Sequence, residues 1–265
     1  MSSHPSSPFQ KHSRTSQAKI VSSHGRLASR TRQGTTFLLA LLLLSGMALG
    51  PSAGAQKKSP AGSVFAQDKG KLNILLDGKS VGREEFEISP NGGGWVAKGS
   101  SSLKPPDGPQ AHVTGTLTLQ PDGAPISYDW TAQSEKNNSA HVLFANGVAK
   151  MTLQMQGARP FEQDLTFTSP SIIVLDNNLY YQYGVLARIF DWSRRGTQNF
   201  SVLIPQELTP GTITVESAGS LSADGKSYEG LKVTTSDIEV VLYLDANHRL
   251  MRLEVPTAKV SVVRE

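Results

Sequence analysis

The sequence of 265 residues contains no cysteine. This absence excludes disulfides, thiolate metal sites and cysteine nucleophiles. It also excludes a lipid-anchored bacterial lipoprotein, because that class carries a cysteine at its mature N-terminus. Histidine is scarce as well: only His112, His141 and His248 lie beyond the N-terminal region, and none of them has a second histidine at a metal-binding spacing. We therefore assign no metal ligand and no cofactor.

Recognisable catalytic motifs are also lacking. No G-x-S-x-G nucleophile elbow occurs, and the glycine run at 91–94 lacks the Lys-Ser/Thr that a phosphate-binding loop requires. Glu84, Glu85 and Glu87 form a cluster of charges that we interpret as a solvated strand edge; a general acid–base pair is the alternative. Because a Ser–His–Asp triad can assemble from distant segments, a hydrolase stays open as the third functional hypothesis, with no catalytic residue assigned.

The N-terminal region has no acidic residue. Residues 1–33 carry six basic residues, an apolar block follows at 37–50, and Ala53-Gly54-Ala55 matches the small-residue pattern of a cleavage site. This order predicts a secretory signal peptide over residues 1–55, with an unusually long n-region. We expect export to the periplasm or the extracellular space. We expect no membrane span after processing, because the apolar block is short for one.

Beyond residue 55 the chain has no excess of positive charge. Its 20 basic and 22 acidic residues leave a net charge near −2, although the whole chain carries +4. The basic balance of the whole sequence therefore does not indicate nucleic-acid binding, and we expect no nucleic-acid partner. Residues 56–69 are predicted to be a flexible lead-in, and residues 70–265 have the length of a single antiparallel β domain.

Apolar and polar residues alternate through most of this domain. In one such run the side chains of Met151 and Leu153 are expected to point inward, and those of Thr152 and Gln154 outward. Asp-Gly and Asn-Gly dipeptides separate several of the runs, and such dipeptides are typical of tight hairpins. The pattern therefore predicts an antiparallel meander of about twelve strands.

One stretch departs from this alternation. Residues 178–194 are predicted to form a helix that follows an Asp-Asn-Asn capping sequence at 176–178. Apolar side chains occupy most of its circumference, which indicates burial on most sides, and Gly184 and Arg188 belong to a narrow polar strip. The predicted fold is mainly β: a strongly twisted antiparallel sheet or open half-barrel, with one buried helix on its concave face.

Two segments, Leu75–Ile88 (LLDGKSVGREEFEI) and Tyr243–Pro256 (YLDANHRLMRLEVP), have the form of hairpins. The first resembles the opening hairpin, and the second the last hairpin, of uncharacterised exported bacterial domains rich in β-structure. In architecture alone, a curved sheet with an inserted helix is similar to the periplasmic lipoprotein carriers and their outer-membrane receptor. This resemblance implies an open half-barrel with an apolar concave face for acyl chains, although the acylated cysteine of the receptor is absent here.

The apolar side chains suggest a ligand site, because methionine and aromatic residues together form adaptable apolar surfaces. We predict that eight of them line a site for an apolar or lipid-like ligand: Phe144, Met151, Met155, Phe167, Tyr183, Leu186, Phe190 and Trp192. The first functional hypothesis is thus a non-enzymatic exported envelope protein with this ligand in the hollow of the curved sheet. The alternative is a protein–protein interaction or assembly module of the cell envelope, with a filled core and another envelope protein as its partner.

Overall fold

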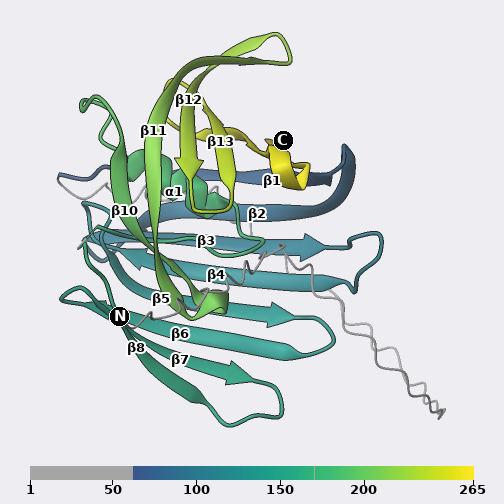
Figure 1. Cartoon of the computed structure of the whole chain (residues 1–265), viewed down its shortest axis with the longest axis vertical. Helices are drawn as coiled ribbons and strands as arrows, with labels where there is room; N and C mark the ends of the chain where they lie inside the picture. Colours follow the sequence, from purple (N-terminus) through teal and green to yellow (C-terminus); the bar gives the residue numbers. More distant parts are fainter. Residues whose placement is uncertain (1–61, 170) are drawn as a thin grey trace, which may run out of the picture.

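The structure is a computed structural model that describes residues 62–169 and 171–265. The predicted signal peptide and residues 56–61 of the predicted lead-in lie outside the described residues. Over the described residues the chain forms fifteen strands, one α-helix and two short 3₁₀-helices, η1 (Pro205–Glu207) and η2 (Pro256–Ala258) (Figure 1).

All fifteen strands belong to one sheet. In chain order they are β1 (Asp68–Leu76), β2 (Lys79–Asn91), β3 (Gly94–Leu103), β4 (Ala111–Leu119), β5 (Pro125–Gln133), β6 (Asn137–Ala145), β7 (Val148–Met155), β8 (Phe161–Thr166), β9 (Ile172–Val174), β10 (Gln198–Ile204), β11 (Thr209–Ala223), β12 (Lys226–Thr234), β13 (Glu239–Leu244), β14 (Leu250–Val255) and β15 (Val260–Arg264). Hydrogen-bonded neighbours follow the order β8-β7-β6-β5-β4-β3-β2-β1-β15-β14-β13-β12-β11-β10-β9. The predicted mainly-β class is confirmed. The strands outnumber the twelve expected, and the sheet is mixed, because β9 pairs with β10 in parallel.

Tight turns account for much of the antiparallel pairing. Asp77 and Gly78 have φ angles of 51° and 76°, and Asn146 and Gly147 have φ angles of 53° and 76°. A type I′ hairpin turn requires two consecutive positive φ angles, and the Asp-Gly and Asn-Gly dipeptides adopt them at low energetic cost.

The first and last strands, β1 and β15, pair with each other and join the two halves of the sheet.

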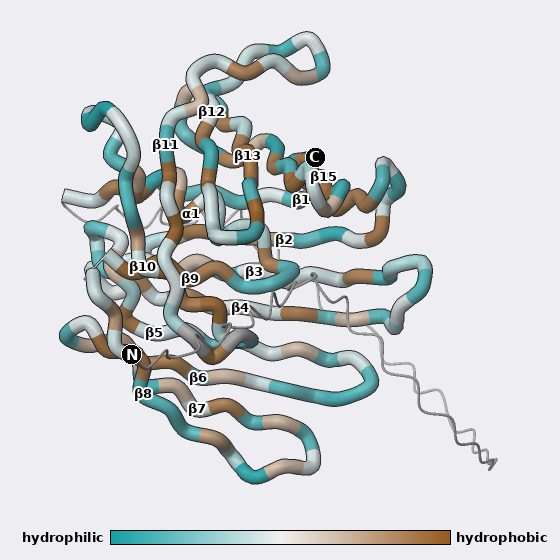
Figure 2. The backbone as a smooth tube through the Cα atoms, viewed as in Figure 1, coloured by the Kyte–Doolittle hydropathy of each residue, from teal (hydrophilic) through white to brown (hydrophobic). Residues whose placement is uncertain are grey.

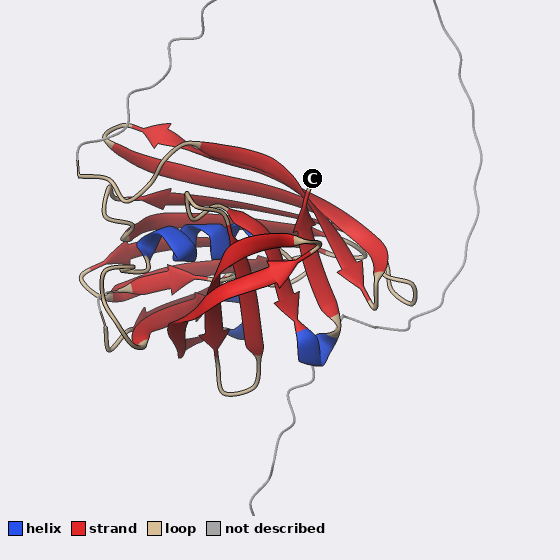
Figure 3. Cartoon of the chain, turned by 90° about the horizontal axis from the view of Figure 1, so that it is seen from above, coloured by secondary structure: helices blue, strands red, loops and turns tan. Residues whose placement is uncertain are grey.

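The sheet curls on itself but does not close into a barrel. Its end strands, β8 and β9, are not hydrogen-bonded to each other. β10 to β13 cross over the strands of the first half, and the helix lies between the two layers (Figures 1 and 3). Apolar and polar residues alternate along the strands (Figure 2). As predicted, Met151 and Leu153 are buried, and Thr152 and Gln154 are exposed. The core therefore fills the inside of the curl.

The helix α1 (Tyr181–Ile189) is shorter than the predicted 178–194. It ends at Phe190, where a ψ of 128° leaves the helical region. At its start the N-cap is Tyr180, and no side chain of 176–178 caps it. No helix among the described residues is long and apolar enough to cross a membrane.

The predicted polar strip is buried within α1, whereas Asp191, which belongs to the same strip, lies beyond the end of the helix and is exposed. Gly184 and Arg188 are both covered by the sheet. The guanidinium of Arg188 lies 3.6 Å from Oδ2 of Asp68 on β1, and Arg264 on β15 lies 2.6 Å from the other oxygen of the same carboxylate. Burying a charge requires such partners. The end of α1 is therefore fixed to the seam between the first and last strands.

Part of the predicted lead-in is packed against the core. Phe65 is buried, and its ring lies 5.7 Å from the ring of Trp95 on β3. The N–H of Val64 donates to the carbonyl of Pro121 in the turn after β4. The described lead-in therefore contacts the core, and β1 begins at Asp68 within the range predicted as lead-in.

Candidate functional site

The N-terminus of α1 lies over two facing glycines of the sheet. Gly99 on β3 and Gly115 on β4 are directly opposite each other in the ladder. A side chain at Gly99 would collide with the ring of Tyr181, and a Cβ at Gly115 would lie 2.8 Å from the hydroxyl of Tyr128. The absence of side chains at both positions makes room for two tyrosines under the helix.

Glu84 on β2 caps α1 from the sheet. Its carboxylate accepts hydrogen bonds from the backbone N–H groups of Tyr180 at 2.6 Å and Tyr181 at 2.9 Å. These bonds satisfy donors at a helix terminus, and the ionised form of the side chain would face the positive end of the helix dipole. The side chain is fully buried. This burial raises the pKa of Glu84 to about 8, although the two N–H bonds act in the opposite direction.

The interpretation of Glu84 as part of a solvated edge is therefore wrong, whereas Glu85 and Glu87 are exposed as predicted. The reason is the period of the strand. Glu84 lies on the same face of β2 as the buried Phe86 and Ile88, and alternate residues of a strand share a face. A glutamate in the apolar register was the signal that sequence reasoning missed.

Asp176 is the second buried carboxylate under the helix. Its Oδ2 accepts a hydrogen bond from the Tyr128 hydroxyl at 2.5 Å, and its Oδ1 accepts one from the side-chain amide of Gln206. Its backbone N–H donates to Oε1 of Gln182, whose Nε2 donates to the Tyr128 hydroxyl at 3.1 Å. Burial raises the pKa of Asp176 to about 7, against the lowering effect of its hydrogen bonds. Asp176 therefore ties the chain before α1 to β5.

This network is suited to anchoring the helix. Its carboxylates are 0% exposed at Glu84 and 6% exposed at Asp176, so a dissolved substrate does not reach them in this conformation. Buried carboxylates with raised pKa values are also common in active sites, but an active site needs access as well. The hydroxyl groups of Tyr181 and Ser101 are buried and have no hydrogen-bond partner among the described residues.

The histidines lie outside this network. His141 on β6 is on the outer face of the sheet, with Nδ1 2.6 Å from Asp129 on β5, and His112 is on the same face of β4, the strand on the other side of β5. His248 stacks on the ring of Trp192 at 4.1 Å between centroids. Within the described ranges, no three His, Asp or Glu side chains gather closely enough to hold a metal ion.

The eight predicted lining residues are distributed unevenly over the interior. Four of them are buried in the core: Met151, Phe167, Leu186 and Phe190. Three are partly buried against it: Phe144, Tyr183 and Trp192. Side chains such as Leu186, at 0% exposure, are covered by other atoms on every side, which leaves no space for a ligand beside them. The role of the eight residues in ligand binding stays a prediction.

Met155 differs from the other seven, because it is 43% exposed at the end of β7. Phe161 at the start of β8 is 42% exposed, and it is the cross-strand partner of the inward-facing Leu153. Since alternate residues share a face, Met155 and Phe161 both extend the concave apolar face to its rim. We call these two side chains the apolar rim. Phe161 is not among the eight residues predicted to line the site, although it lies on the same face of the sheet.

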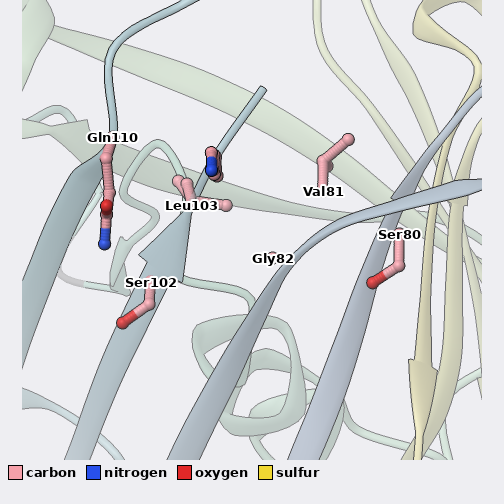
Figure 4. A pocket seen from close by; sticks show the side chains of 7 residues that line it. Ser80, Val81, Gly82, Ser102, Leu103 and Gln110 are labelled. Atoms are coloured by element: carbon pink, nitrogen blue, oxygen red, sulfur yellow. The ribbon is translucent and has the colours of Figure 1, made fainter. Parts of the chain in front are cut away.

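A shallow depression of about 260 Å³ lies elsewhere, where β2 and β3 meet the loop before β4 (Figure 4). Its walls combine hydroxyl, amide and aliphatic groups from Ser80, Val81, Gly82, Ser102, Leu103, Lys104 and Gln110. None of the eight predicted lining residues belongs to it, and it is open to solvent.

No family model matches the sequence, and the comparison with curated proteins found no match. Two solved structures are similar in shape. One is a β-barrel-like protein of the domain of unknown function DUF1849 from Brucella abortus, with a TM-score of 0.49, 11% identity and coverage of 76% of this chain and 95% of that chain. The other is a DUF1089 family protein from Pseudomonas aeruginosa, with a TM-score of 0.39, 11% identity and coverage of 73% and 93%. At these values the likeness concerns general shape and gives no indication of function.

Proposed function

We propose that this chain is an exported, non-enzymatic binding protein of the cell envelope that takes an apolar or lipid-like ligand on the concave face of its curled sheet. The observation that carries the proposal is the apolar rim. Met155 and Phe161 are large and exposed, and they continue an apolar face whose next member, Leu153, is buried. Methionine and phenylalanine together adapt well to apolar ligands of varied shape.

The position of the rim modifies the initial hypothesis. The space under α1 is filled by Leu186 and its neighbours, so the ligand contacts the open end of the sheet between β7 and β8. The apolar side chains of the rim gain about 25 cal/mol for each Å² that a ligand removes from water. The similarity to lipoprotein carriers enters here only as an architectural precedent for acyl-chain binding on a curved sheet.

The test is the binding of an environment-sensitive apolar dye, N-phenyl-1-naphthylamine, to the purified protein, together with native mass spectrometry for a co-purified ligand. The double variant Met155→Ser with Phe161→Ser is expected to bind the dye at least about tenfold more weakly. Leu143→Ser is the matched control, because Leu143 is 50% exposed on the outer face of β6. Equal loss of dye binding in both variants would contradict the assignment of the ligand to the rim.

A second candidate function is the interaction or assembly module. It is favoured by the edge of the sheet at β8, to which no described strand other than β7 is hydrogen-bonded. A strand edge with unpaired backbone groups can bind an extended segment of another protein. The dye experiment tests the first candidate, because pairing at the edge depends chiefly on backbone groups and only in part on the rim side chains.

A further inference from the structure

The backbone of β8 has hydrogen-bonding groups that point away from the sheet. β8 is paired with β7 on one side only. The N–H of Phe167, just after the strand, donates to the carbonyl of Gly147 at 2.9 Å. In an antiparallel ladder, alternate residues direct both backbone groups to the same neighbour. Counting back from Phe167, Glu162 and Asp164 therefore direct their N–H and C=O groups outward, and no described backbone group bonds to them.

The side chains of Glu162 and Asp164 add negative charge to this edge. Both are exposed on the outer face of the sheet. Their cross-strand neighbours are Thr152 and Lys150, but neither carboxylate forms an ion pair or a hydrogen bond within the described ranges. Within the described ranges, the two unpaired carboxylates thus belong to the same two residues whose backbone groups point outward.

This edge is unsuited to pairing with a second copy of itself. Antiparallel self-pairing centred on Gln163 would place Glu162 opposite Asp164. Self-pairing centred on Asp164 would place two copies of that aspartate opposite each other. Like charges directly opposite each other destabilise a strand pair. The negative charge therefore selects against the homodimer and in favour of a partner strand with positive charge.

We infer that β8 binds an extended segment of another protein in which lysine or arginine alternates with apolar residues. In antiparallel pairing, residues directly opposite each other have their side chains on the same face. The basic side chains of the partner would lie beside Glu162 and Asp164, and its apolar side chains would lie on the concave side, beside Phe161 and Leu165. The inference rests on the second candidate function, and it specifies which types of residue the partner segment contains.

The test uses a fluorescein-labelled peptide of alternating lysine and valine with the purified protein, measured by fluorescence anisotropy. We expect saturable binding that weakens with salt, and we expect the amides of Glu162 and Asp164 to exchange hydrogen more slowly when the peptide is bound. In the peptide, the N–H groups of the lysines point toward β8 and those of the valines point away. N-methylation of the lysine amides is therefore expected to abolish binding, and N-methylation of the valine amides is expected to be tolerated.

The charge requirement is tested with the double variant Glu162→Lys with Asp164→Lys. It is expected to bind the lysine peptide roughly tenfold more weakly and to prefer the same peptide with glutamate in place of lysine. The control variant Asp107→Lys with Asp237→Lys changes the net charge equally at exposed loop positions and is expected to keep the affinity. If the affinity for the lysine peptide fell equally in both variants, the net charge of the protein alone would explain the binding, and the inference would be overturned.

Two further outcomes would also overturn it: binding of the lysine-methylated peptide with unchanged affinity, or no binding of the unmodified peptide at low salt. Dye binding at the apolar rim is measured on the same edge variant and is expected to be unchanged. If the edge variant loses peptide binding but keeps dye binding, the result shows a role for the edge alone. The proposed ligand function is then tested separately by the rim variant.

Discussion

The two edges of the sheet are protected in opposite ways. β9 is three residues long, and all three are buried. The chain continues from it into Asp176, whose carboxylate is hydrogen-bonded to Tyr128 on β5. β8 is six residues long and mostly exposed, and its outer face carries Glu162 and Asp164. Natural sheets avoid uncontrolled pairing either by covering an edge or by charging it. This molecule covers one edge with a buried polar network and charges the other.

The comparison also shows two uses of the same chemical group. Under the helix, the carboxylates of Glu84 in mid-sheet and Asp176 after the covered edge accept hydrogen bonds and hold α1 and the adjoining chain in place. At the open edge, the carboxylates of Glu162 and Asp164 have no partner within the described ranges and are available to a ligand. Removing a carboxylate should therefore affect folding in the first region and binding in the second.

The largest expected effect is the loss of packing under the helix. Leu186→Ala is expected to destabilise the protein by about 2–5 kcal/mol, because truncation of a fully buried leucine side chain leaves a cavity. Phe161→Ala at the open rim removes a larger side chain but is expected to cost less than about 1 kcal/mol, since that side chain is already 42% exposed. Chemical denaturation of both variants measures the difference. Equal costs would mean that the rim is as well packed as the core.

The next effect is the loss of the cap. Glu84→Ala is expected to cost about 1–3 kcal/mol, because it leaves the N–H groups of Tyr180 and Tyr181 buried without an acceptor. Glu162→Ala is the matched change at the open edge and is expected to stay within about 0.5 kcal/mol. Thermal melts of the two variants at one pH provide the measurement. A cost at Glu162 as large as that at Glu84 would contradict the contrast between the buried network and the open edge.

The same cap gives the stability a dependence on pH. Burial raises the pKa of Glu84 from 4.5 to about 8 and that of Asp176 from 3.8 to about 7. The folded state therefore holds protons on these two groups that the unfolded state releases, so their contribution to stability is largest below a pH of about 3.8 and is lost as the pH rises to about 8. Glu84→Gln removes one of these groups and is expected to flatten the profile by on the order of 1 kcal/mol. A profile of unchanged slope in this variant would show that Glu84 does not titrate in the window.

The strand pattern could be predicted from the sequence because it is local. The period of two correctly placed Met151 and Leu153 inside, and the Asp-Gly and Asn-Gly dipeptides placed the hairpin turns. The pairing of β1 with β15 and the parallel pairing of β9 with β10 join distant segments, and no local pattern marks them. The local patterns were therefore sufficient to predict the fold class, but they did not predict the order of the strands in the sheet.

The candidate site could be predicted only in part, for the same reason. The buried helix followed from its apolar circumference, but its cap is supplied by Glu84, which is 97 residues from Tyr181 in the sequence. The capping preference of the Asp-Asn-Asn sequence was a local argument, and the tertiary contact overrode it. The exposure of Met155 depends on where β7 and β8 end relative to each other, which alternation alone does not determine.

The smallest expected effect concerns a glycine inside the helix. Gly184→Ala is expected to stabilise the protein by about 0.5–1 kcal/mol, because alanine is the better helix former. The new methyl group would lie 3.6 Å from Cβ of Leu250, an ordinary contact distance. Gly99→Ala is the matched control: its methyl group would collide with the ring of Tyr181, and overpacking of this kind costs about 1–3 kcal/mol. Melting temperatures that shift in opposite directions would show that the helix tolerates added volume toward β14 but not toward β3. A loss of stability in Gly184→Ala would mean that α1 is packed against β14 more tightly than the 3.6 Å contact implies.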